Sequence, residues 1–86
     1  MPEISRFYGI IIRMFYCDHS PPHFHAVHNR WEIRVGISPL EIIEGEAPAR
    51  MVNLVMEWAQ KHARELMVNW DRCRQGFIPL KISRLE

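Results

Sequence analysis

One nine-residue stretch, residues 17–25, gathers the side chains of this chain that are best suited to chemistry. It reads CDHSPPHFH and contains three of the five histidines, one of the two cysteines and a Pro-Pro pair. Imidazole, carboxylate and thiolate groups bind zinc and similar divalent ions, and imidazole is also the most frequent general acid or base. The stretch therefore indicates a metal site, a catalytic centre or a stiff turn between two strands.

The metal-site hypothesis rests on the pattern Asp-His-x3-His-x-His. Two histidines at positions i and i+2 of a strand lie on one face and can both reach one ion. The loop before them could add an oxygen or nitrogen ligand, or the thiolate of Cys17. The predicted ligands of a divalent ion such as zinc are Asp18, His19, His23 and His25. The spacing matches none of the well-defined zinc signatures, and the alternative is an Asp-capped turn followed by an ordinary strand surface.

The catalytic hypothesis is a metal-independent ribonuclease. Such an enzyme needs a base, an acid and a cation beside the phosphate, roles that histidine, glutamate and arginine can fill. The candidate catalytic residues are His23, His25, Glu32, Arg13 and Arg34. The alternative is a solvated cross-strand set of charged side chains, in which each pair stabilises the sheet by roughly a few tenths of a kcal/mol.

The length and the net charge of the chain limit the functions that it can have. The chain is predicted to form one domain, residues 1–86, of ordinary globular composition, with 48% hydrophobic and 24% charged residues. The net charge of +1 gives no overall attraction to nucleic acid, so contact with RNA would need a local basic patch. A chain of this size lies near the lower limit of independent stability, and we therefore expect a small partner protein or a homodimer.

The cysteines and the apolar runs favour a cytoplasmic protein. Cys17 and Cys73 are too few for a disulfide framework, so both are expected to be reduced. No signal-peptide pattern opens the chain, and charged residues interrupt every apolar run. These features argue against secretion and against a membrane span.

The hydrophobic pattern predicts three or four strands in the first half of the chain. We expect strands at residues 9–16, 23–28 and 31–37, and a short edge strand at 40–43, because β-branched and aromatic residues are frequent there. Only Asn29-Arg30 separates the second and third strands, a spacing that indicates a tight hairpin. Residues 44–47 are predicted to form a turn.

One long helix is predicted from Pro48 to about Arg74, where Pro48 suits the first helical position and no further glycine or proline follows. Its predicted buried stripe recurs at three- and four-residue steps and comprises Met51, Leu54, Val55, Trp58, His62, Leu66, Met67 and Cys73. Gly76 is expected to stop the helix, and the tail either adds a short strand or drapes over the helix. The predicted fold is α+β, a three- or four-stranded antiparallel meander packed on one long C-terminal helix.

Alternation of side chains along each strand sorts the sheet into a core face and an outer face. The residues assigned to the core face are Ile10, Ile12, Met14, Tyr16, Phe24, Ala26, Trp31, Ile33, Val35 and Ile37. The residues assigned to the outer face are Ile11, Arg13, Phe15, His23, His25, Val27, Glu32 and Arg34. Polar and aromatic groups on a half-open sheet face suit binding, and the predicted binding residues are Asp18, His19, Ile11 and Phe15.

Three segments carry a family resemblance, namely residues 2–14 (PEISRFYGIIIRM), 18–26 (DHSPPHFHA) and 54–59 (LVMEWA). They resemble a short bacterial family catalogued as domain of unknown function 4160, and the D-H-x-P-P-H-F-H segment is the most specific of them. The resemblance extends to His62, Glu65, Leu66, Asn69, Trp70, Gln75 and Gly76. It implies no established reaction, but it implies a gene pair of the toxin–antitoxin kind with another small protein.

The function predicted from these observations is that of one protein of a toxin–antitoxin-like pair. Its His-rich outer sheet face is expected to bind a cognate protein partner. The alternatives are a ribonuclease toxin that uses His23 and His25 with Arg13 or Arg34, and a module that binds a divalent metal such as zinc.

Overall fold

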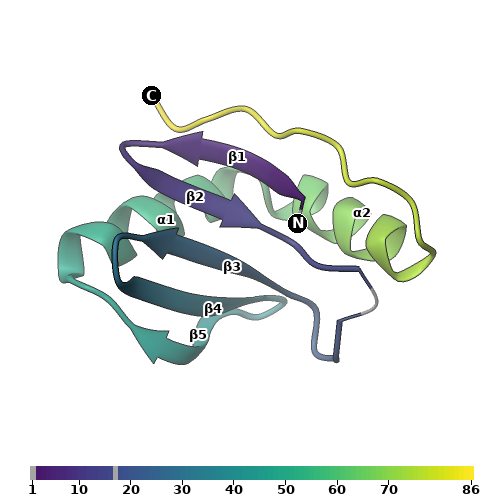
Figure 1. Cartoon of the computed structure of the whole chain (residues 1–86), viewed down its shortest axis with the longest axis horizontal. Coiled ribbons are helices and arrows are strands. Elements are labelled where there is room, and N and C mark those ends of the chain that lie inside the picture. Colours follow the sequence, from purple (N-terminus) through teal and green to yellow (C-terminus); the bar gives the residue numbers. More distant parts are fainter. Residues whose placement is uncertain (1, 17) are drawn as a thin grey trace.

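The computed structural model describes residues 2–16 and 18–86, which form a five-stranded antiparallel sheet followed by two helices (Figure 1). The elements are β1 (Glu3–Phe7), β2 (Ile10–Arg13), β3 (His23–His28), β4 (Trp31–Ile37), β5 (Leu40–Glu46), α1 (Ala49–Lys61) and α2 (Ala63–Arg74). The strands lie in the sheet in the order of the chain, so the sheet is a meander. The α+β class and the meander are confirmed, but the sheet has more strands than predicted.

The additional strand is β1, which the sequence pattern did not reveal. The predicted strand over residues 9–16 is present but shorter, as β2 (Ile10–Arg13), and a turn at Tyr8 and Gly9 joins it to β1. Both residues have positive φ angles, 50° and 80°, as tight hairpin turns require. A bulky residue such as Tyr8 rarely adopts a positive φ, so its type gave no turn signal.

The hairpin of β3 and β4 is as predicted. His28 pairs with Trp31, and Asn29 at the turn has a φ of 55°. Asparagine tolerates this left-handed conformation better than most residues do, which explains how Asn-Arg replaces the more common Asn-Gly.

The edge strand β5 is longer than the predicted residues 40–43, and the predicted turn at 44–47 is wrong. The ladder shifts register between Arg34 and Val35, where Ile43 is the extra residue of a bulge. Gly45 then continues the strand with a φ of +88°, close to the carbonyl oxygen of Glu32. Glycine in this segment therefore marks a bulged strand and not a turn.

The prediction of one long helix is wrong, because the helical stretch breaks at His62. The backbone of His62 has φ −122° and ψ 23°, and its N–H bonds to the carbonyl of Ala59. Its ring lies 5.4 Å from that of Trp58, and its Nδ1 lies 2.6 Å from a carboxylate oxygen of Glu65. No glycine or proline marks this break. Pro48, predicted as the first helical residue, is instead the N-cap residue of α1. Gly76, with a φ of 85°, follows the end of α2 as predicted.

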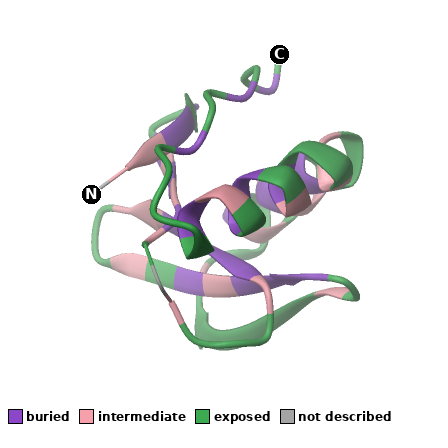
Figure 2. Ribbon diagram, turned by 90° about the vertical axis from the view of Figure 1, so that its right-hand side faces the viewer, coloured by how far each residue is buried: buried purple, intermediate pink, exposed green. Residues whose placement is uncertain are grey.

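The core lies between the sheet and the two helices, which pack on one face of the sheet (Figures 1 and 2). The residues predicted for the core that are buried are Ile10, Ile12, Met14, Phe24, Ala26, Ile33, Val35 and Ile37. Trp31 is half-buried. Tyr16 is 44% exposed, and its assignment to the core is wrong because β2 ends at Arg13 and the alternation ends with it.

The C-terminal tail, residues 77–86, forms no strand in the described part of the chain, but it lies along β1 (Figure 1). The Ile82 N–H donates to the carbonyl of Ile4 at 2.8 Å. The indole N–H of Trp58 donates to the carbonyl of Ser83 at 2.8 Å. The tail thus covers the β1 edge of the sheet. Over residues 2–16 and 18–86, neither helix has the length and apolar character that crossing a bilayer requires.

Candidate metal centre

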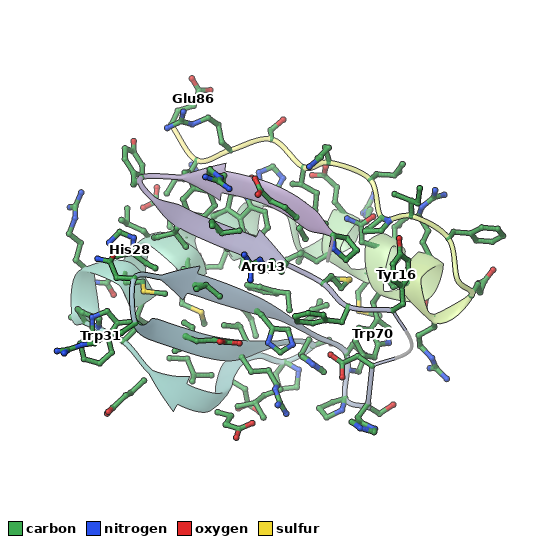
Figure 3. The ribbon with its side chains drawn as sticks, in the orientation of Figure 1. Arg13, Tyr16, His28, Trp31, Trp70 and Glu86 are labelled. Atoms are coloured by element: carbon green, nitrogen blue, oxygen red, sulfur yellow. The ribbon has the colours of Figure 1, made fainter. Side chains whose placement is uncertain are left out.

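Three side chains from the CDHSPPHFH stretch converge at one end of the sheet. The Oδ2 atom of Asp18 lies 2.9 Å from Nε2 of His23 and 3.4 Å from Nε2 of His25. One potential ligand atom from each of the three residues lies within 4.8 Å of the other two. The cluster lies beside Trp70, which is labelled in Figure 3.

Local structure explains why these three groups meet. His23 and His25 are two residues apart on β3, so the strand presents them side by side. His25 pairs with Arg13 of β2 and Arg34 of β4, whereas His23 pairs with Gly36 of β4. The connection from β2 to β3 passes through the prolines at 21 and 22, which stiffen it and bring Asp18 over the strand.

The opposite ring nitrogens are held by acceptors. Nδ1–H of His23 donates to the carbonyl of Pro21 at 2.7 Å, and Nδ1 of His25 lies 3.3 Å from Oε2 of Glu32, which can accept a hydrogen bond from it. A carbonyl cannot donate, so the Nδ1 atom of His23 must carry the proton. In the neutral form of His23, Nε2 then presents a lone pair toward Asp18, and a neutral His25 does the same when its proton lies on Nδ1 beside Glu32. This arrangement of outer hydrogen bonds is the one that orients metal-binding histidines.

Asp18 is the anionic member of the cluster. Partial burial raises the pKa of its carboxyl group, but hydrogen bonds from the His19 backbone N–H and from His25, with the charge and hydrogen bond of His23, hold that pKa below its ordinary value overall. The His19 N–H donates to Oδ1 at 2.8 Å, which leaves Oδ2 for the two imidazoles. An ionised carboxylate only accepts, so each Nε2 needs a proton or a cation between itself and Asp18.

The donor set fits a first-row divalent ion. Ligand atoms at the usual zinc distances of about 2.0–2.1 Å stand about 3.3 Å apart in a tetrahedron. The contacts of Asp18 with the two histidines, at 2.9 and 3.4 Å, are close to that spacing. Two imidazoles and one carboxylate leave a further coordination position, as in zinc sites that bind water or a substrate.

An aromatic shell covers both imidazoles. The ring of His23 lies 5.2 Å from that of Trp70, and the ring of Phe15 meets that of His25 edge-on at 4.5 Å. His23 is 2% exposed and His25 is 9% exposed. Such packing limits ring rotation and keeps the nitrogen atoms in place.

The prediction that both histidines lie on a half-open sheet face opposite the helices is therefore wrong, because both are buried. His23 is the first residue of β3 and lies beyond the last pair between β2 and β3, so its ring reaches Trp70 of α2. His25 lies on the outer face, but Phe15 and Asp18 of the preceding connection cover it. Trp70 was not predicted to be part of the site, and its one signal in the sequence was its place among the residues that carry the family resemblance.

The other predicted ligands are not part of the cluster. The side chain of His19 is exposed, and this residue contributes its backbone N–H to Asp18. Cys17 lies outside the described residues.

The candidate catalytic residues are divided between two places. His25, Glu32 and Arg34 line a pocket of about 230 Å³ together with Glu44 and Gly45. Arg34 is held by Glu44, whose carboxylate lies 2.9 Å from its Nη2 atom.

The two remaining members of the catalytic set, His23 and Arg13, do not line this pocket. His23 faces Asp18, and Arg13 pairs with His25 on the outer face, where Figure 3 labels it. Of the predicted binding residues, Ile11 and Phe15 are half-buried.

Fold and site together define a small α+β domain that carries a cluster of two buried histidines and one half-buried carboxylate. The chain belongs to the family described as domain of unknown function DUF4160, whose family model matches residues 9–71. That span contains Asp18, His23 and His25. No curated protein and no solved structure matches the chain.

Proposed function

We propose that this domain binds one divalent transition-metal ion, zinc in the first instance, through Asp18, His23 and His25. One observation carries the proposal: two buried Nε2 atoms face the same carboxylate oxygen, while acceptors hold both Nδ1 atoms. Nitrogen and oxygen ligands of this kind suit zinc and its neighbours in the first transition row.

A metal ion explains the cluster better than protons alone. Without a metal, His23 would need to be an imidazolium ion to donate to both the Pro21 carbonyl and Asp18, and a further proton would have to lie between His25 and Asp18, with the two ring centroids 5.2 Å apart and little solvent around them. Burial of charged groups is costly unless each is paired and hydrogen-bonded. One divalent ion would replace both Nε2 protons and would leave the Nδ1–H bonds to Pro21 and Glu32 unchanged.

The chain's own residues suggest what the ion would do. Asp18 belongs to the connection between β2 and β3, whereas the histidines belong to β3, so a shared ion would fix the connection on the sheet. When bound, zinc with an open position supplies a Lewis acid that polarises a water or substrate oxygen. Glu32 and the Pro21 carbonyl would hold the two rings in the binding tautomer.

A second candidate function is the binding of a partner protein as one half of a toxin–antitoxin-like pair. The observation that favours it is the edge strand β5, whose residues 41–46 are all exposed (Figure 2). This function is compatible with a metal centre, because the two features lie on different strands.

The test of metal binding uses the full chain, purified without a histidine tag and freed of metal by a chelator. We expect one zinc ion per chain by elemental analysis after dialysis, and loss of that ion in the variants Asp18→Asn and His25→Gln. At free zinc of 100 times Kd, the gain in stability is about 2.7 kcal/mol, which raises Tm by about 10–20 °C for a domain of this size.

Two control variants keep the result interpretable. His19→Ala removes the exposed neighbour of Asp18, and His62→Gln removes a histidine at the break between the helices. Both should bind zinc like the wild type. A chain that binds no zinc, or variants of Asp18 and His25 that bind it as well as the wild type, would refute the proposal.

A further inference from the structure

We propose that the outer edge of β5 accepts an extended, basic segment of a partner protein as a sixth strand of the sheet. The inference rests on the second candidate function, the binding of a partner protein, and does not depend on the metal centre. It rests on the backbone, the exposure and the charge of Leu40–Glu46.

The two edge strands of the sheet, β1 and β5, differ in whether another segment of the chain lies along them. The tail lies along β1, with the Ile82 N–H bonded to the carbonyl of Ile4. In the described part of the chain, no backbone hydrogen bond other than those of the β4–β5 ladder involves β5. An uncovered strand edge presents unpaired N–H and C=O groups, and extended peptides bind such edges by adding a strand.

The side chains of β5 combine apolar and acidic groups. Ile42 and Ile43 are each 39% exposed, which is high for large apolar residues on a strand. Glu41, Glu44 and Glu46 are also exposed. In the described residues only Glu44 of these three forms an ion pair, with Arg34, so Glu41 and Glu46 present uncompensated negative charge.

The negative charge of β5 indicates which kind of segment can pair with this edge. Antiparallel pairing of two copies of β5 would place glutamates against glutamates, and like charges directly opposite destabilise a sheet. A segment that alternates lysine or arginine with apolar residues would instead match both the glutamates and the isoleucines. The bulge at Ile43 makes the edge uneven, which further disfavours pairing with unadapted strands.

The covered edge offers an internal precedent for this chemistry. The segment along β1 carries Lys81, whose ammonium group donates to the carbonyl of Glu3 at 2.7 Å. The neighbouring Ile82 supplies both a backbone hydrogen bond and a buried apolar side chain. The tail thus covers β1 with a lysine followed by an apolar residue, the composition that we infer for the segment on β5.

The experiment is a nuclear magnetic resonance titration of the full, nitrogen-15-labelled chain with two capped peptides. Each peptide has the seven-residue length of β5, one alternating lysine with valine and the other glutamate with valine. We expect the lysine peptide to shift the amide resonances of residues 40–46, equally with and without a chelator, and the glutamate peptide to leave them unchanged.

A charge-reversal pair of variants tests the assignment. Glu41→Lys with Glu46→Lys should weaken binding of the lysine peptide about tenfold and admit the glutamate peptide, since each reversed rim charge changes affinity modestly. Glu57→Lys with Glu86→Lys makes the same change in net charge on other exposed residues and should leave binding unchanged. Equal melting temperatures would establish that both double variants are folded.

Three results would overturn the inference. The first is the absence of binding by the lysine peptide, or resonance shifts centred outside β5. The second is equal weakening in the control variant, which would indicate unspecific attraction. The third is concentration-dependent shifts at β5 without peptide, which would assign the edge to a second copy of the chain.

Discussion

Oε2 of Glu32 of β4 lies 3.3 Å from Nδ1 of His25 of β3, and in this ring orientation the other ring nitrogen faces Asp18. The two residues come from neighbouring strands of one hairpin, and they face each other diagonally on the outer face. At the proposed metal centre, Glu32 would therefore have a positioning role, in which its carboxylate acts through the imidazole of His25 and would not itself touch the ion.

Replacement of Glu32 by glutamine should therefore weaken zinc binding without abolishing it. Outer hydrogen-bond partners of metal-binding histidines typically contribute about 10- to 100-fold in affinity. Competition with a chromophoric chelator would measure the change. Glu46→Gln, on the residue that pairs with Glu32 across the ladder, should have no effect. Equal affinities of Glu32→Gln and the wild type would exclude the positioning role.

Acidification should release the metal. Histidine ligands must be deprotonated at Nε2 to bind, so zinc competes with protons and its affinity falls as the pH decreases. The pKa of Asp18 lies below its ordinary value, so protonation of its carboxylate requires a more acidic solution than for an ordinary aspartate. Calorimetric titrations in buffers of different ionisation heat would report the protons released per zinc. An affinity independent of pH would contradict histidine ligation.

The attachment of the C-terminal tail to α2 should depend on the hydrogen bonds of Asn69. Its side-chain amide donates to the carbonyl of Leu80 at 2.8 Å and accepts from the N–H of Leu80 at 2.7 Å, and the residue is 1% exposed. Asn69→Ala removes both bonds and leaves polar groups of the tail without partners, at a cost of about 1–3 kcal/mol in the free energy of unfolding. Urea denaturation would measure the loss. Asn53→Ala on the exposed side of α1 is the control and should change stability little.

Two glycines with positive φ should respond differently to alanine. At Gly76 a Cβ atom would meet nothing within 4 Å, so Gly76→Ala pays only for the left-handed backbone, about 1–2 kcal/mol. At Gly45 a Cβ atom would also collide with the carbonyl of Glu32, so Gly45→Ala should destabilise the protein more. Thermal unfolding of the two variants would rank them. If Gly76→Ala were the more destabilising variant, the backbone of β5 around Gly45 would have to shift to make room for the added methyl group.

The alternation of side chains was the most reliable guide to this fold. It placed Ile12, Phe24 and Ile33 in the core, and it put His25 on the outer face beside Glu32 and Arg34. It succeeded because regular strands obey the two-residue period. It failed at Tyr16, after β2 had ended, and it could not anticipate that the connection from β2 to β3 folds over His25.

The remaining errors arose where backbone conformation departs from residue preference. Tyr8 adopts a positive φ and thereby creates β1, and His62 leaves the helical conformation although its type is compatible with a helix. At both positions tertiary contacts accompany the departure: Trp58 packs on His62, and the guanidinium of Arg84 lies over the ring of Tyr8. Local sequence does not encode such contacts, so these features became visible only in the structure.

The most direct test of the account is the ring-nitrogen state of each histidine in the presence of one equivalent of zinc. In a chain labelled with nitrogen-15 histidine, long-range proton–nitrogen spectra distinguish protonated, neutral and metal-bound nitrogens. We predict that zinc converts Nε2 of His23 and His25 to metal-bound nitrogens, that their Nδ1 atoms are protonated in the zinc-bound form, and that His19, His28 and His62 are unchanged. Metal-bound signals from any of those three histidines, or no change at His23 and His25, would contradict it.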